Sequence, residues 1–240
     1  MKRIAIQGVG GAFHDIAARG YFDNEEVETV PCHTFKDVFK AIDKDDNLLG
    51  IIAIENTIAG SLLQNHNLLR ESGCLIIGEY KLRISHQLAV LPGQKLEDIN
   101  EVCSHPIALM QCEDFLDAHK NLRAVETDDT ALSAKEIAEN NITGRAAICS
   151  RLAAELYGLE ILAEGIETNK RNFTRFLIIA KPDLAYKMNR QMVLNKSTLV
   201  FTLPHEEGSL SKVLSVLSFY HMNLTKIQSL PIIGREWEYQ

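Results

Sequence analysis

Short apolar runs alternate with segments of helical periodicity along most of the chain. The strand-like runs lie near residues 3–7, 50–54, 74–78, 84–90, 122–126, 146–150 and 174–180. Between them, Thr34 and Asp129 each stand before an apolar stripe with one-face spacing, which is typical of a helix preceded by its N-cap. This order predicts an α/β fold in which helices cover parallel sheets.

Two crossings are expected to divide a main domain, residues 1–182, into two α/β subdomains. The chain should pass from the first to the second near residues 79–83 and return near residues 163–172. Subdomain 1 then comprises about residues 1–80 and 165–182, and subdomain 2 comprises about residues 81–164. The polar stretch that begins at Lys181-Pro182-Asp183 predicts a linker over residues 183–196.

Residues 197–240 have the pattern of a small α+β module. The β-branched run 197–203 predicts a strand. Residues 210–217 carry an apolar stripe with helical spacing, and residues 223–229 predict a second strand. The module therefore begins with a strand, a helix and another strand.

Composition narrows the classes of function. A chain of 240 residues with 46% hydrophobic and 24% charged residues is typical of a soluble protein with more than one domain. The net charge of −7 argues against broad nucleic-acid binding. The five cysteines include no CxxC pair, which favours free thiols in a reducing compartment. Because the sequence has no signal-peptide h-region and no apolar run of transmembrane length, we expect a cytoplasmic protein without a membrane partner.

Polar side chains follow the apolar run of residues 51–54. Glu55, Asn56 and Thr57 stand where this buried strand ends, and open α/β sheets bind ligands beyond the carboxyl ends of their strands. Asn56 and Thr57 offer hydrogen-bond donors and acceptors there, and Gly60 lets the backbone approach closely. The structural alternative is a cap on the following helix.

A second candidate segment runs from Ser104 to Cys112. Pro106 is typical of the first turn of a helix, and Ser104 stands just before it. Free N–H groups at a helix N-terminus attract anions, and Gln111 follows about a turn and a half later. The alternative is a helix cap with no ligand.

The third segment is Asn172-Phe173-Thr174-Arg175-Phe176, followed by the apolar run 177–180. Polar groups at the mouth of a buried strand cost desolvation free energy unless they pair with each other or with a ligand. A fixed charge beside a small hydroxyl suits an enzyme that holds a carboxylate and moves one proton. The alternative is that Arg175 makes a surface salt bridge and that Thr174 is an ordinary strand residue.

The order and spacing of these three segments closely resemble the prephenate dehydratase family, and so do residues 8–14 and 146–159. The resemblance implies two α/β lobes arranged as in periplasmic binding proteins, with the active site between them. Residues 197–240 resemble the first half of an ACT regulatory domain, without its final helix and strand.

The resemblance implies decarboxylating dehydration of prephenate to phenylpyruvate, water and CO2 in phenylalanine biosynthesis, with no metal or redox cofactor. Of the implied catalytic residues, Thr174 donates a hydrogen bond or proton to the departing hydroxyl, and Arg175 clamps a carboxylate with its bidentate fork. Glu55 is expected to pair with Arg175. The remaining residues implied at the substrate are Asn56, Thr57, Ser104, Gln111, Asn172 and Phe176.

The ACT resemblance implies a phenylalanine site between paired modules, and hence a homodimer or homotetramer. The implied residues are Gly208, Ser209, Leu210 and Asn223. Gln228-Ser229-Leu230-Pro231 stands where the family usually has Glu-Ser-Arg-Pro, so the loss of both charges predicts weaker feedback inhibition.

The chain departs from the family pattern at Ala12 and His14, where a small hydroxyl residue and a serine are usual; the His14 imidazole is still able to donate or accept a proton. Three alternatives stay open. Arogenate dehydratase would use the same residues, and a non-catalytic amino-acid-binding protein would share the two-lobed fold. A nucleotide-dependent oxidoreductase is suggested by Gly8-Val9-Gly10, but the bulky Phe13 stands where the third glycine of that motif belongs.

Overall fold

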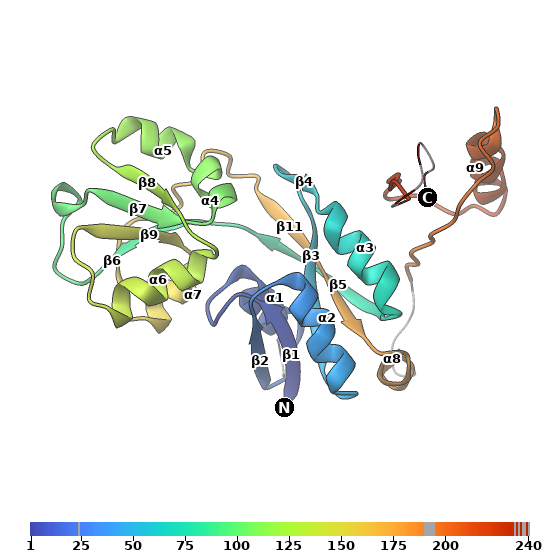
Figure 1. Cartoon of the computed structure of the whole chain (residues 1–240), viewed down its shortest axis with the longest axis horizontal. Helices are drawn as coiled ribbons and strands as arrows, with labels where there is room; N and C mark the ends of the chain where they lie inside the picture. The colour runs from blue at the N-terminus through green and yellow to red at the C-terminus, as the bar shows by residue number, and fades with distance from the viewer. Residues whose placement is uncertain (24, 190–194, 233, 235, 237–238, 240) are drawn as a thin grey trace. The chain divides into compact units, whose positions relative to one another are not determined.

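The computed structural model describes residues 1–23, 25–189, 195–232, 234, 236 and 239. The chain divides into two compact units, Met1–Met192 and Val193–Gln240. The first unit contains two sheets, each the centre of one lobe (Figure 1). Among the described residues, no helix is both long and apolar enough to span a lipid bilayer.

The sheet of lobe 1 has the strand order β2-β1-β3-β11-β5, and β4 adds to the end of β3. The strands are β1 (Lys2–Gln7), β2 (Val27–Cys32), β3 (Leu49–Asn56), β4 (Gly60–Ser61), β5 (Leu75–Arg83) and β11 (Phe173–Ala180). β1 runs parallel to β2 and β3, whereas β11 runs antiparallel to β3 and β5.

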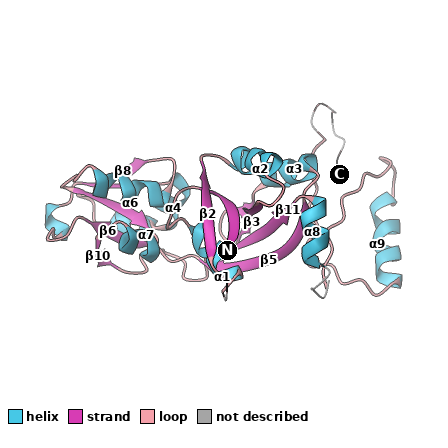
Figure 2. Cartoon of the chain, turned by 90° about the horizontal axis from the view of Figure 1, so that it is seen from below, coloured by secondary structure: helices cyan, strands magenta, loops and turns pink. Residues whose placement is uncertain are grey.

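Helices cover both faces of this sheet, as Figure 2 shows for α1 on one face and α2 and α3 on the other. The helices of lobe 1 are α1 (Phe13–Tyr21), α2 (Phe35–Lys44), α3 (Leu63–Ser72) and α8 (Pro182–Asn189). Alternate residues of β11 separate the two cores: Phe176 and Ile178 pack on the α1 side, and Leu177 and Ile179 pack on the α2 side.

Lobe 2 repeats this three-layer arrangement around the strand order β10-β6-β9-β7-β8. Its strands are β6 (Gln87–Val90), β7 (Glu101–Ser104), β8 (Arg123–Glu126), β9 (Arg145–Cys149) and β10 (Glu160–Ala163). Residues of α6 and α7 pack on one face, and residues of α4 and α5 pack on the other. These helices are α4 (Pro106–Gln111), α5 (Glu113–Ala118), α6 (Thr130–Glu139) and α7 (Arg151–Leu156), and a 3-10 turn spans Leu96–Asp98.

Each strand run expected up to residue 180 overlaps an observed strand, although residues 84–86 of the run 84–90 are not part of one, and both helix caps are confirmed. Thr34 accepts a hydrogen bond from Asp37 N, and the Asp129 carboxylate accepts from Ala131 N and Leu132 N. The expectation of parallel sheets is wrong, because both sheets are mixed. In lobe 1, β11 pairs antiparallel with β3 and β5, and in lobe 2, β6 pairs antiparallel with β9 and β10.

The segment expected to be a linker begins with a helix instead. α8 occupies residues 182–189, and the side chain of Ala185 is fully buried in the core of lobe 1. Pro182 is the first residue of α8, a position at which proline's missing N–H costs nothing. The proline that suggested a turn therefore starts a helix, and lobe 1 extends beyond residue 182.

Two segments join the lobes, at residues 84–86 and 164–172, close to the expected crossings. They hydrogen-bond to each other: Ile84 N donates to Asn172 O at 2.8 Å, and Ile166 N donates to His86 O at 2.9 Å. The passage between the lobes is therefore a paired double connection.

In the second unit, the expected helix is present as α9 (Ser209–Phe219), and the two expected strands are absent. Residues 197–203 and 223–229, all of them described, adopt no strand and belong to neither sheet. A strand is stable only beside partners that satisfy its backbone groups and cover a face. The pattern of these segments alone was not sufficient to form a sheet.

Candidate active site

The carboxyl ends of the central strands meet at the seam between the lobes. The loop after β1 contacts α7 of lobe 2: Ser150 Oγ donates to Gly11 O at 2.6 Å, and Tyr157 Oη donates to Gly10 O at 2.8 Å. A Cβ on Gly11 would lie 2.6 Å from the Ala153 Cα, and the φ of Gly11 is 84°. Only glycine permits this approach, so the glycine motif brings the lobes together.

A polar cluster of four side chains, which we call the amide cluster, lies at this seam: Asn56 from β3, Thr174 from β11, Asn172 just before β11, and Gln111 from α4 of lobe 2. Each of the four is at least nine-tenths buried. Asn56 Nδ2 donates to Asn172 Oδ1 at 2.8 Å and to Thr174 Oγ1 at 2.9 Å.

The amide of Asn56 has a fixed orientation. Its Oδ1 accepts hydrogen bonds from Ile58 N at 2.9 Å and Ala59 N at 2.8 Å, in the turn that follows β3. Its nitrogen must then face Thr174 and Asn172. Asn56 is thus both a local turn residue and a donor to the cluster. It does not cap the following helix, because the N-cap of α3 is Leu62.

Gln111 closes the cluster from the other lobe. Asn172 Nδ2 donates to Gln111 Oε1 at 2.9 Å, and Gln111 Nε2 lies 3.5 Å from Asn56 Oδ1. The sequence segments containing Asn56, Gln111 and Thr174 therefore come together as expected. Thr174 Oγ1 accepts from Asn56 Nδ2, and no hydrogen bond among the described residues uses the Thr174 hydroxyl as a donor, so its proton is available to a ligand.

Arg175 lies apart from this cluster. Successive strand residues point to opposite faces, so the Arg175 side chain leaves β11 on the face opposite to Thr174. Its guanidinium lies 3.2 Å from a carboxylate oxygen of Glu55 and 3.6 Å from one of Glu79, which confirms the expected pairing with Glu55. The expectation that Thr174 and Arg175 act side by side on one ligand is not supported by this geometry.

Three other residues expected at the ligand lie outside the amide cluster. Ser104 is the last residue of β7 and is completely buried, with its Oγ donating to Ile148 O; His105 is the N-cap of α4. Phe176 is 1% exposed in the core of lobe 1. Thr57 Oγ1 donates to Arg171 O and accepts from Phe173 N, so it ties the β3 turn to the returning segment.

His14 lies in the core and not at the seam. Its Nε2 accepts a hydrogen bond from Ala53 N at 3.3 Å, where the register between β3 and β11 shifts, and its ring packs edge-on against Phe176. Burial lowers the pKa of His14 to about 3, so the ring is a neutral acceptor at physiological pH. His14 thus accepts a backbone hydrogen bond inside the core of lobe 1.

This burial predicts a pH-dependent stability. The pKa of His14 is about 6.5 when the chain is unfolded and about 3 when it is folded. Below about pH 6.5 the unfolded chain binds a proton at His14 that the folded chain does not bind. The free energy of unfolding therefore falls by about 1.4 kcal/mol for each pH unit below that value. Between about pH 7 and pH 5, the free energy of unfolding should fall about 2 kcal/mol more in the parent than in His14→Gln.

Denaturant unfolding at the two pH values measures this difference. Glutamine keeps an acceptor for the Ala53 N–H but cannot be protonated. His33→Gln, a substitution of an exposed histidine, is the matched control and should keep the pH dependence of the parent. An unchanged pH dependence in His14→Gln would contradict the assignment.

Comparison with known proteins identifies the family. The prephenate dehydratase family model matches residues 4–184, which include the whole amide cluster. The chain belongs to this family.

Known relatives align with almost the whole length of this chain. The chain is 40% identical over 230 residues to arogenate dehydratase/prephenate dehydratase 2 of Arabidopsis thaliana, covering 96% of this chain and 59% of that protein. It is 40% identical over 231 residues to arogenate dehydratase 1 of Petunia hybrida, covering 95% of this chain and 53% of that protein. The chain thus spans little more than half the length of these curated relatives.

Solved structures share the fold. The Arthrobacter aurescens prephenate dehydratase in complex with L-Phe is 27% identical, with a TM-score of 0.82 over 99% of this chain and 78% of that one. GqqA, described as a novel type of quorum quenching acylase, is 30% identical, with a TM-score of 0.80 over 99% of this chain and 84% of that one.

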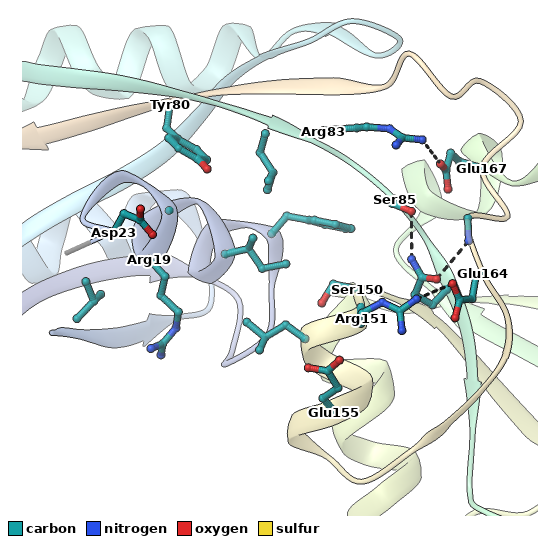
Figure 3. Close-up of a pocket in the computed structure, with 18 of the residues that line it drawn as sticks. Arg19, Asp23, Tyr80, Arg83, Ser85, Ser150, Arg151, Glu155, Glu164 and Glu167 are labelled. Atoms are coloured by element: carbon teal, nitrogen blue, oxygen red, sulfur yellow. Dashed lines mark hydrogen bonds and ion pairs between the residues drawn. The ribbon is translucent and has the colours of Figure 1, made fainter. Parts of the chain in front are cut away.

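A separate pocket of about 1230 Å³ lies between α1 and lobe 2, and no residue of the amide cluster lines it (Figure 3). Its charged side chains largely neutralise one another, as in the pairs Arg151–Glu164 at 2.6 Å and Arg83–Glu167 at 3.7 Å. The lining carries four basic and six acidic side chains, a formal charge of −2 that does not favour a dianionic ligand, so the amide cluster is the better candidate for the active site.

Sequence reasoning missed His86, whose Nε2 lies 2.9 Å from Gln111 Oε1. The available signal was weak: His86-Gln87 is a polar pair inside the apolar run 84–90. The run suggested an ordinary strand, and only the fold shows that its first residues form the passage between the lobes.

Proposed function

We propose that this chain catalyses the decarboxylating dehydration of prephenate to phenylpyruvate, water and CO2, a step in the synthesis of phenylalanine. The observation that carries the proposal is the Thr174 hydroxyl, which is held by Asn56 and keeps its own proton free at the seam. Membership of the prephenate dehydratase family supports the same conclusion.

The chemistry requires few groups. Loss of the ring hydroxyl and the ring carboxylate gives an aromatic ring, and this aromatisation drives the reaction. The enzyme must hold the dianion and assist a poor leaving group. Thr174 donates a hydrogen bond to the departing hydroxyl, and Asn56 polarises the threonine by donating to its oxygen.

Neutral amides suit a dianionic substrate. With a net charge of −7, the chain attracts an anion only through local donors. Amide N–H groups supply such donors without adding a carboxylate that would repel the substrate. We assign substrate orientation to Gln111, whose NH2 group makes only a long contact of 3.5 Å. Asn56, whose two amide hydrogens already serve Asn172 and Thr174, holds the Thr174 hydroxyl in place.

Arg175 has a different role in this proposal. The Arg175 guanidinium pairs with Glu55 of β3 and with Glu79 of β5, the strands on either side of β11. It therefore links three neighbouring strands of the sheet. We therefore propose that Arg175 supports the strand that carries Thr174, in place of the carboxylate clamp expected from the sequence.

Arogenate is the alternative substrate, since it differs from prephenate only by an amino group in place of the keto group. Several similar proteins are named arogenate dehydratases. Turnover of both compounds by the purified chain, followed as phenylpyruvate absorbance and as phenylalanine formation, decides the preference. Turnover of neither would refute the proposed function.

We also propose that phenylalanine regulates the chain by binding between paired copies of the second unit. The candidate residues are Gly208, Ser209, Leu210 and Asn223, and Gly208 has a φ of 78° at the start of α9. The Arthrobacter relative was solved with L-Phe. The uncharged Gln228-Ser229-Leu230-Pro231 segment predicts weaker binding than in relatives with Glu-Ser-Arg-Pro.

Calorimetric titration of phenylalanine tests this proposal. We expect binding heat from the 240-residue chain and none from a version that ends at residue 189, which keeps α8 and its buried Ala185. Equal heats from both versions, or none from either, would mean that residues 197–240 do not form the regulatory site.

A further inference from the structure

His86 lies in the first segment that joins the lobes and is held there by the second. Its backbone N–H donates to Glu167 Oε2 at 2.9 Å, and its carbonyl accepts from Ile166 N at 2.9 Å. The residue is 2% exposed. The returning segment also holds Gln111, because Thr168 N donates to Gln111 O at 2.8 Å. His86 and Gln111 are thus fixed beside each other by three consecutive residues of the returning segment, 166–168.

The hydrogen bonds determine the tautomer of His86. Gln111 Oε1 lies 2.9 Å from His86 Nε2 and accepts from Asn172 Nδ2, also at 2.9 Å. Because an amide oxygen can only accept, His86 Nε2 must carry the proton. His86 Nδ1 is buried without a hydrogen-bond partner, and burial lowers the pKa of the imidazole, so the ring is neutral.

This arrangement orients the Gln111 amide. With Oε1 engaged by two donors, the NH2 group must point away from His86 and toward Asn56, whose Oδ1 is 3.5 Å away. That contact is long and therefore weak, so the NH2 group can exchange it for a hydrogen bond to a stronger acceptor. A flipped amide would instead present Oε1, an acceptor, to an anionic substrate.

We propose that His86 is a positioning residue: as its Nε2–H tautomer, it holds the Gln111 side chain with the NH2 group turned into the seam, ready to donate to a substrate carboxylate. The inference rests on the proposed function in one respect only, namely that Gln111 contacts the substrate. The orientation itself depends on the hydrogen bonds of His86 and Asn172.

Two substitutions separate positioning from packing. His86→Gln places an amide donor near the position of Nε2, whereas His86→Leu fills the space without a donor. We expect His86→Leu to raise KM and lower kcat, with a combined loss of about tenfold or more in kcat/KM, and His86→Gln to recover most of that loss. His119→Leu is the control, because His119 is a hydrogen-bonded histidine of lobe 2 outside the cluster.

Nitrogen-15 NMR provides a readout that does not depend on activity. In the parent, His86 should show a protonated Nε2 and an unprotonated Nδ1. The side-chain amide signals of Gln111 should shift in His86→Leu and stay close to the parent in His86→Gln. If the parent turns over neither prephenate nor arogenate, the proposed function fails, while these spectra still test the orientation. A protonated Nδ1 in the parent, or parent-like kcat/KM in His86→Leu, would overturn the inference.

Discussion

Replacing Thr174 with valine is expected to lower kcat by about 10²–10⁴, the usual range for loss of a group that donates a proton in the transition state. Valine has nearly the shape of threonine, so the 8% exposed site should stay packed. The missing oxygen removes the only threonine hydroxyl of the amide cluster. Steady-state kinetics with prephenate, accompanied by a thermal melt, measures the change.

Thr174→Ser is the matched variant, since it keeps a hydroxyl that Asn56 Nδ2 can reach. We expect serine to recover most of the activity lost with valine. A folded Thr174→Val protein with near-parent kcat would exclude the hydroxyl from the reaction. Equal defects in the two variants would show that packing, and not the proton, matters at this position.

Asn56→Asp is expected to have the second large effect, a loss of about 10³ in kcat/KM. The aspartate keeps the oxygen that accepts from Ile58 N and Ala59 N, but it loses the donor to Thr174. It also places a negative charge beside the substrate dianion. Two like charges about 4 Å apart repel by about 4 kcal/mol at an effective dielectric constant of about 20.

Asn65→Asp is the control for burying a new carboxylate. Asn65 is also a buried amide of lobe 1, and its Nδ2 donates to Ala53 O at 2.7 Å, outside the cluster. We expect both variants to lose stability and only Asn56→Asp to lose most of its kcat/KM. Similar kinetic losses in the two would contradict the placement of the substrate at Asn56.

Local signals predicted much of the main domain. Thr34 and Asp129 were identified as caps because a side-chain oxygen before an apolar stripe satisfies free backbone N–H groups within the same turn. The missed strands β2, β4, β7 and β10 lack such local evidence. β4 has two residues, β7 and β10 have four each, and β2 contains Pro31, so their pairing depends on partner strands and not on a local pattern.

The candidate site was predictable in part. A sequence pattern marks the ends of strands and the starts of helices. These local signals identified the three segments that contain Asn56, Gln111 and Thr174. The separation of Thr174 from Arg175 follows from the two-residue period of a strand, and only the structure shows which face carries the cluster. The contact of His86 with Gln111 joins the first connecting segment to α4 of lobe 2, and no local pattern encodes it.

The most direct test of the account is turnover of prephenate labelled with carbon-13 in the ring carboxylate. We expect the parent to release labelled CO2 and phenylpyruvate at equal rates, and Thr174→Val to lower both rates by the same factor. Absence of labelled CO2 from the parent, or its undiminished release by Thr174→Val, would contradict the claim that the amide cluster carries out the dehydration.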